Sequence, residues 1–212
     1  MRTLAEGVQQ LAGRPPNTIN VYLVGDVLVD AGTPGARRRI LRELAGREVR
    51  THVVTHAHPD HFGSSHAVCD ALGLPLWTGA GDAEAVETAS PVPAQGRVPA
   101  LMAKMKMPPA HPVARRLHEG DEVAGFVVLD VPGHSPGHIA LWREADRTLV
   151  CGDVFFNMPS LRPPPGFLTY DPERNRASMR RLAELRPALV LFGHGAPLRD
   201  PDRLAAVAAA GG

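Results

Sequence analysis

The segment THAHPDHFG, residues 55–63, places three histidines and one aspartate within six consecutive positions. These four residues are His56, His58, Asp60 and His61. The residues just before them, VRTHVV, are mostly β-branched, which is typical of a short buried strand. Ligand-binding side chains of α/β proteins gather in the loops beyond strand ends. The segment therefore predicts a ligand site at the edge of a sheet.

Three later segments repeat this arrangement, with a His or an Asp next to glycine after an apolar stretch. They are PGHSPGH with His134, CGDVF with Asp153, and FGHG with His194. Imidazole and carboxylate suit zinc and similar divalent ions. Five histidines and two aspartates exceed the four ligands of a tetrahedral structural site, which would usually recruit cysteine. The surplus predicts two metal ions that share one carboxylate and leave a place for water.

The composition narrows the class of protein. A chain of 212 residues suits one α/β domain spanning residues 1–212. A net charge of +1 gives no bulk attraction to nucleic acid or to an anionic membrane, and no apolar stretch is long enough to span a bilayer. Two cysteines, Cys69 and Cys151, cannot form a disulfide scaffold, so we expect a reducing compartment, the cytoplasm. Glu6 and Gln9 make the N-terminal segment a poor signal peptide.

Strand and helix patterns alternate in both halves of the chain, and strands outnumber helices. This predicts sheets with helices outside them. A hairpin is expected over residues 20–32, and helices over 35–48, 62–74, 81–89, 172–186 and 201–210. Further strands are expected over 49–56, 75–79, 117–123, 125–133, 139–145, 148–155 and 187–195. Residues 90–116 have no clean period apart from a possible short helix near 101–105, and residues 157–172 are predicted to be a Pro-rich loop.

The motifs HAHPDH, GHSPGH, GDVF and GHG, in this order, resemble the metallo-β-lactamase fold superfamily over most of the chain. The resemblance implies an α/β fold, a four-layer αβ/βα sandwich of two mixed β-sheets with helices on the outer faces. It also implies two Zn²⁺ ions, or Fe or Mn, at one edge between the sheets. By motif position, the ligands would be His56, His58 and His134 for one ion, Asp60, His61 and His194 for the other, and Asp153 as the bridge. Asp30 matches a position that supports the histidine loop.

Within this superfamily, GHSPGH most resembles the hydroxyacylglutathione hydrolase (glyoxalase II) branch, which hydrolyses thioesters. The resemblance implies that the second histidine, His138, lies near the metals or substrate, although a histidine at a strand start can also simply bond to the backbone. Lactonase-like relatives place a tyrosine near the metals, so Tyr170 is a candidate to donate a hydrogen bond to the oxyanion. The alternative is that Tyr170 only packs in front of the following helix. In that branch a C-terminal helical segment with basic residues grips glutathione, whereas here only 18 residues, rich in Ala, follow His194, so specific recognition of glutathione is not implied.

The expected function is metal-dependent hydrolysis of a thioester, lactone or similar bond in a small molecule, by a hydroxide bridging the two ions, with Asp60 orienting it. Three alternatives stay open: a mononuclear iron dioxygenase acting on persulfides, a nuclease of the tRNA 3′-processing kind, and a metal-free binding module. No organic cofactor is expected, and the oligomeric state, monomer or dimer, is open. The remaining histidines are predicted to be surface or packing residues: His52, His66, His111 and His118.

Overall fold

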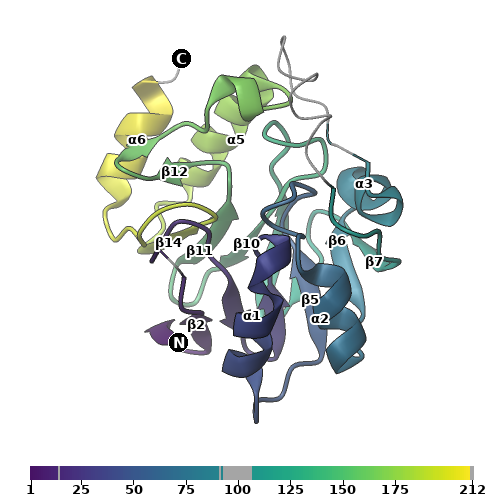
Figure 1. Cartoon of the computed structure of the whole chain (residues 1–212). Coiled ribbons are helices and arrows are strands. Elements are labelled where there is room, and N and C mark those ends of the chain that lie inside the picture. Colours follow the sequence, from purple (N-terminus) through teal and green to yellow (C-terminus); the bar gives the residue numbers. More distant parts are fainter. Residues whose placement is uncertain (14, 91, 93–106, 211–212) are drawn as a thin grey trace.

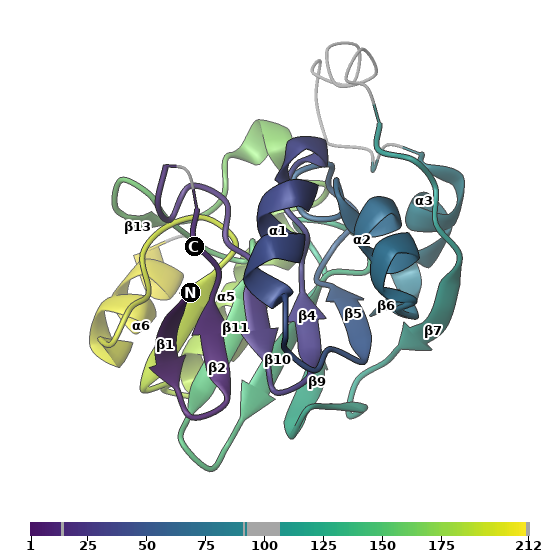
Figure 2. The same cartoon turned by 60° about the horizontal axis from the view of Figure 1, so that its bottom comes forward.

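In the computed structural model, two β-sheets face each other and helices cover their outer faces (Figures 1 and 2). The structure describes residues 1–13, 15–90, 92 and 107–210. The short helix predicted near residues 101–105 lies outside the described residues. Among the described helices, none is both long and apolar enough to cross a membrane.

The first sheet runs in chain order through its described strands. They are β1 (Arg2–Ala5), β2 (Val8–Gln10), β3 (Tyr22–Val24), β4 (Val27–Val29), β5 (Thr51–Val54), β6 (Leu76–Gly79) and β7 (Val113–Leu117). Strands β1 to β4 pair antiparallel, and β4 to β7 pair parallel. Parallel neighbours need crossover connections. These contain α1 (Arg37–Leu44), α2 (Ser65–Leu72) and α3 (Ala83–Thr88), with the short 3-10 turns η1 (Pro34–Ala36) and η2 (Ala80–Asp82) before α1 and α3.

The second sheet has the order β14-β11-β10-β9-β8. Its strands are β8 (Glu122–Val123), β9 (Phe126–Asp130), β10 (Ile139–Arg143), β11 (Thr148–Gly152) and β14 (Leu189–Phe192). Among the described strands of this second sheet, only β11 and β14 pair parallel and the other pairs are antiparallel, so this sheet is mixed as well. Its outer side carries α5 (Pro172–Glu184) and α6 (Pro201–Ala210). Between β11 and α5 lie a small β12 (Phe156–Asn157) and β13 (Leu161–Arg162) pair and the 3-10 turn η3 (Gly166–Leu168).

Three apolar clusters fill the spaces between four layers. One joins α1 and α2 to the first sheet, a second lies between the sheets, and a third joins the second sheet to α5 and α6. Neighbouring residues of one strand alternate between clusters: Leu141 of β10 packs between the sheets, whereas Trp142 packs on the helix side. That period of two is the strand pleat. The four-layer αβ/βα sandwich is therefore confirmed.

Several predicted boundaries are confirmed in detail. The hairpin turns between β3 and β4 at Gly25. Helix α2 ends at Gly73, whose φ of +66° is the left-handed cap that favours glycine. Helix α5 begins at Pro172, and the Asp171 carboxylate accepts hydrogen bonds from the backbone amides of Glu173 and Arg174.

Other predictions of secondary structure were wrong. Strands β1 and β2 were not predicted, because they span only three or four residues and their register is interrupted between Thr3 and Ala5. Strand β7 lies in a stretch predicted to be irregular, because Arg115 and Arg116 are both exposed on this edge strand and hide its alternation. The Pro-rich loop contains the β12–β13 pair and η3.

Candidate metal centre

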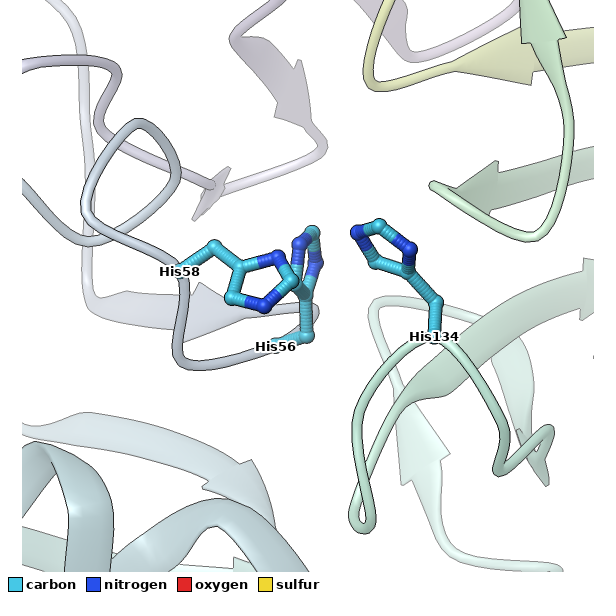
Figure 3. Close-up of side chains that lie close together, drawn as sticks. All are labelled: His56, His58 and His134. Atoms are coloured by element: carbon cyan, nitrogen blue, oxygen red, sulfur yellow. The ribbon is translucent and has the colours of Figure 1, made fainter. Parts of the chain in front are cut away.

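The predicted metal-binding side chains all follow strand ends, and the fold brings these ends to one edge between the sheets. The loop after β5 carries His56, His58, Asp60 and His61 from the first sheet. The loops after β9, β11 and β14 carry the other three from the second sheet: His134, Asp153 and His194. Figure 3 shows His56 and His58 on one loop, with His134 facing them from another.

The carboxylate of Asp153 lies at the middle of this group. Its Oδ2 is 3.8 Å from Nε2 of His56, 3.4 Å from Nε2 of both His61 and His134, and 3.3 Å from Nε2 of His194. A single carboxylate oxygen therefore faces four imidazoles from three different loops, those after β5, β9 and β14.

The donors fall into two groups of three that a further group links. Ligand atoms of His56, His58 and His134 lie within 4.8 Å of one another, and so do those of Asp60, His61 and His194; those of His56, His61 and Asp153 meet the same limit and join the two groups. In the second group, Oδ2 of Asp60 is 3.1 Å from Nε2 of His194. The division is the one that the sequence resemblance implies for two ions.

In each histidine, the hydrogen bond made by one ring nitrogen decides whether the other ring nitrogen is free to bind a metal. The Thr55 hydroxyl donates to Asp30 Oδ2 at 2.9 Å, so it can only accept from Nδ1–H of His56, 3.1 Å away. Nδ1–H of His61 donates to the same Asp30 oxygen at 2.8 Å. Asp30 also accepts the Thr55 backbone N–H at 2.7 Å, so it supports this loop, as the resemblance implies. Both histidines therefore direct Nε2 at the centre, and Nε2 is the ring nitrogen left to bind a metal.

The same rule holds on the second sheet. The Thr169 hydroxyl donates to the Pro165 carbonyl at 3.0 Å, and so it accepts from Nδ1–H of His134 at 3.4 Å. Nδ1–H of His194 donates to the carbonyl oxygen of Thr18. Four histidines thus direct Nε2 toward Asp153, the arrangement in which outer partners orient metal-binding imidazoles.

Several of these central atoms are buried without a partner. Within the described residues, Nε2 of His56, Nε2 of His134 and Oδ1 of Asp153 are buried and accept no hydrogen bond. An unpaired buried polar atom costs about 1–3 kcal/mol. A cation bound between them would remove that cost. The residues present therefore fit a divalent metal centre.

The electrostatics favour the same conclusion. Burial lowers the pKa of His58 to about 3, so this imidazole is neutral and able to ligate. Burial also opposes protonation of His61 and His194, but the neighbouring carboxylates, Asp153 foremost and Asp60 with it, together outweigh burial and raise the pKa of His61 well above its usual range and that of His194 to about 10. Burial favours the acid form of Asp153, yet His61 and His194 hold its pKa well below the usual range. The centre thus demands positive charge, which bound cations would supply.

A model of the metallo-beta-lactamase superfamily matches residues 14–194. The chain belongs to this superfamily. That range covers all seven metal-type donors and most of the residues that orient them.

Curated relatives of this superfamily cover much of the chain. It is 28% identical over 226 residues to the probable metallo-hydrolase YflN of Bacillus subtilis (strain 168), which covers 92% of this chain and 86% of YflN. It is 32% identical over 145 residues to a hydroxyacylglutathione hydrolase of Methylococcus capsulatus (strain ATCC 33009 / NCIMB 11132 / Bath), which covers 64% of this chain and 47% of that protein. The match thus spans about half the length of the hydroxyacylglutathione hydrolase.

A solved structure shows the same fold. The crystal structure of TTHA1623 in a di-iron-bound form is 30% identical, with a TM-score of 0.69, and covers 93% of this chain and 96% of that one. The chain is therefore a member of a metallo-hydrolase superfamily, and its clustered His and Asp donors are able to bind metal.

Asp82 is a residue of this site whose role the sequence did not reveal. It directly precedes α3, yet its side chain makes no cap bond there. Instead its Oδ2 accepts from the Ala57 N–H at 2.8 Å and from the Ser135 hydroxyl at 2.6 Å, and its Oδ1 accepts from the Gly137 N–H at 2.6 Å. One buried carboxylate therefore ties the first histidine loop to the GHSPGH loop.

The structure places His138 behind the metal-type donors. Its Nε2 accepts a hydrogen bond from the backbone N–H of Asp153 at 3.0 Å, and its ring stacks on His56 with centroids 4.6 Å apart. A Cβ on Gly152 would lie 2.6 Å from Cε1 of His138, so only glycine fits before Asp153. His138 thus holds two of the seven donors in place.

Tyr170 adjoins the site through its backbone. Its N–H donates to the carbonyl of His134 at 3.2 Å, and its side chain is half-buried. The preceding residue, Thr169, is the one whose hydroxyl orients His134. Sequence patterns gave no signal for Thr169 or for Thr18, because one is an ordinary hydroxyl in a loop and the other acts through its carbonyl.

Proposed function

We propose that this protein is a hydrolase that uses two divalent metal ions, in the first instance Zn²⁺, to cleave an ester-like bond such as a thioester or a lactone. The position of Asp153 carries the proposal. Its Oδ2 lies 3.3–3.8 Å from Nε2 atoms that belong to both groups of donors. A carboxylate at that point can serve two ions, and each group retains its own protein ligands.

The roles within the proposed centre follow from the two groups. His56, His58 and His134 would hold one ion, Asp60, His61 and His194 the other, and Asp153 both. Bound there, the ions would supply a water-derived nucleophile near neutral pH and polarise the carbonyl under attack.

Access to this centre is uneven. The side chain of Asp60 is 36% exposed, whereas the other six donors are buried, so solvent and substrate approach from the Asp60 side. Asp60 would accept the hydrogen bond that orients the attacking water. We further propose that the Tyr170 hydroxyl assists the oxyanion and that His138 acts as a positioning residue for Asp153. Replacing His138 by Phe should weaken metal retention, and unchanged retention would remove that role.

The substrate and the compartment are also part of the proposal. A net charge of +1 favours a small-molecule substrate over nucleic acid. Cys69 and Cys151 are both buried free thiols, and burial raises the pKa of Cys69 to about 12, which suits a cytoplasmic protein. Residues 1–212 would act as one catalytic unit, because Thr18 near one end orients His194 near the other.

The second candidate is an iron dioxygenase acting on persulfides, which needs one iron with open positions. TTHA1623, 30% identical to this chain, was solved in a di-iron-bound form, so iron is a candidate metal, but that form holds two ions rather than one. Two complete groups of donors favour the dinuclear hydrolase over that reading.

Metal analysis of the purified protein, paired with a substrate panel, tests the proposal. We expect two metal ions per chain and turnover of a thioester or a lactone, with no turnover of phosphodiesters or β-lactams. One iron per chain with oxygen uptake on persulfides would replace the hydrolase by the dioxygenase. Protein that binds no metal would overturn both.

A further inference from the structure

A second cluster of metal-type side chains lies on the surface of α2 and shares no residue with the centre described above. His66 and Asp70 are four residues apart and so lie on one face of the helix. His111 reaches them from the segment that leads into β7, where its backbone N–H donates to the Val86 carbonyl of α3 at 3.2 Å. Ligand atoms of the three side chains lie within 4.8 Å of one another.

The contacts of His66 favour one tautomer. Its Nε2 is 3.2 Å from Oδ2 of Asp70, within ion-pair distance, and the carboxylate can only accept, which favours the proton on Nε2. The lone pair of the neutral ring is then on Nδ1. That atom faces Nδ1 of His111 at 3.3 Å, and the rings meet edge to face with centroids 5.4 Å apart. A carboxylate behind a histidine is the arrangement that orients an imidazole for a metal.

The separation of the two nitrogens fits one shared cation. Two imidazole nitrogens bound to a tetrahedral zinc at 2.0–2.1 Å lie about 3.3 Å apart. The Nδ1 atoms of His66 and His111 already have this spacing. Both rings are half-buried and Asp70 is exposed, so water can fill the remaining coordination positions.

We propose that His66 and His111, with Asp70 orienting His66, form an auxiliary surface site for a transition-metal dication of the kind that imidazole prefers, such as Zn²⁺, Ni²⁺ or Cu²⁺. An ion there cross-links α2 to the segment before β7, elements that are more than forty residues apart in the sequence. Two protein nitrogens bind this ion more weakly than the seven buried donors would bind their two ions. The surface ion therefore exchanges with ions in the medium. Because the site exists only in the folded chain, binding stabilises the fold.

Zinc titration of the holoprotein tests this site. Protein that retains its resident metal is dialysed against increasing free Zn²⁺, and bound zinc and the unfolding midpoint are measured together. We expect the wild type to take up one more equivalent than His111→Ala, with a rise in the midpoint that the variant lacks. Asp70→Asn should bind that equivalent roughly tenfold more weakly, since it loses the orienting carboxylate.

The exposed His118, which is outside the cluster, gives the matched control, and His118→Ala should bind zinc as the wild type does. Resident metal and catalytic activity should be equal in all four proteins, which separates this site from the buried centre. If wild type and His111→Ala bind the same zinc at every concentration, the two histidines are simply a hydrogen-bonded pair and the site does not exist.

Discussion

The buried centre and the surface cluster on α2 use the same residue types but differ in how their imidazoles are held. In the centre, four histidines each have Nδ1 fixed by a hydroxyl, a carboxylate or a carbonyl, and their Nε2 atoms converge on Asp153. In the cluster, one exposed carboxylate orients one half-buried ring. The comparison indicates that outer partners and burial, rather than the count of His and Asp, would make one site hold its metal permanently and let the other exchange it.

His52 is the opposite case, a buried histidine with no nitrogen free for a metal. It is fully buried beneath the same helix α2, and both of its nitrogens are already used. Nδ1–H donates to the Leu28 carbonyl at 3.0 Å, and Nε2 accepts from the Ser65 hydroxyl at 2.7 Å. No lone pair is left for a metal. A histidine is a candidate ligand only where one of its nitrogens remains free.

The largest expected effect comes from removing a donor of the buried centre. Asp60→Ala or His134→Ala should lose metal and reduce hydrolysis by about a hundredfold or more, because a direct ligand matters more than an outer partner. The circular dichroism spectrum should stay that of the wild type. Metal content and rates on the best substrate of the panel check this, with His118→Ala as the control. Full metal retention in Asp60→Ala would contradict the proposed centre.

Acidification should weaken the packing of His52. Burial lowers the pKa of His52 to about 4, from 6.5 in the unfolded chain. The unfolded state therefore binds the proton more readily, and stability present above pH 6.5 is lost as the pH falls toward 4, by on the order of 3 kcal/mol. Urea denaturation between pH 7 and 4.5 measures it. His52→Gln should flatten this dependence, and an unchanged slope would show that other groups cause it.

Asp82 tests whether the two histidine loops depend on one carboxylate. Asp82→Ala leaves three donors without their acceptor, on Ala57, Ser135 and Gly137, and should lower the free energy of unfolding by about 2–3 kcal/mol. Asp82→Asn keeps one oxygen and should lose less. Equal losses in the two variants would mean that shape, rather than hydrogen bonding, matters at this position.

The sequence predicted sheets with helices outside them and placed all seven donors at strand ends, because each of the four motifs follows an apolar strand. The sequence predicted the four-layer sandwich and the role of Asp30 only through the resemblance. It missed β1, β2 and β7, whose few residues carry no clear period. It also missed Thr18, Asp82 and Thr169, because their partners lie 25 to 176 residues away and only the folded chain brings them together.

The smallest expected effect best separates the contribution of outer partners from that of burial, because the substitution removes an outer partner and leaves the ligand in place. Thr169→Val removes the hydroxyl that accepts from Nδ1–H of His134, but leaves the ligand itself. Metal affinity should fall roughly tenfold, the usual consequence of losing such a partner. Tyr170→Phe, one residue further on, is the matched comparison: it should lower the hydrolysis rate and leave metal affinity unchanged, since its hydroxyl is proposed to act on substrate. Competition with a chelator measures affinity, and initial rates at saturating metal measure catalysis. If Thr169→Val binds metal as tightly as the wild type, His134 is held by its backbone, and the contrast drawn between the buried centre and the surface cluster must then be assigned to burial.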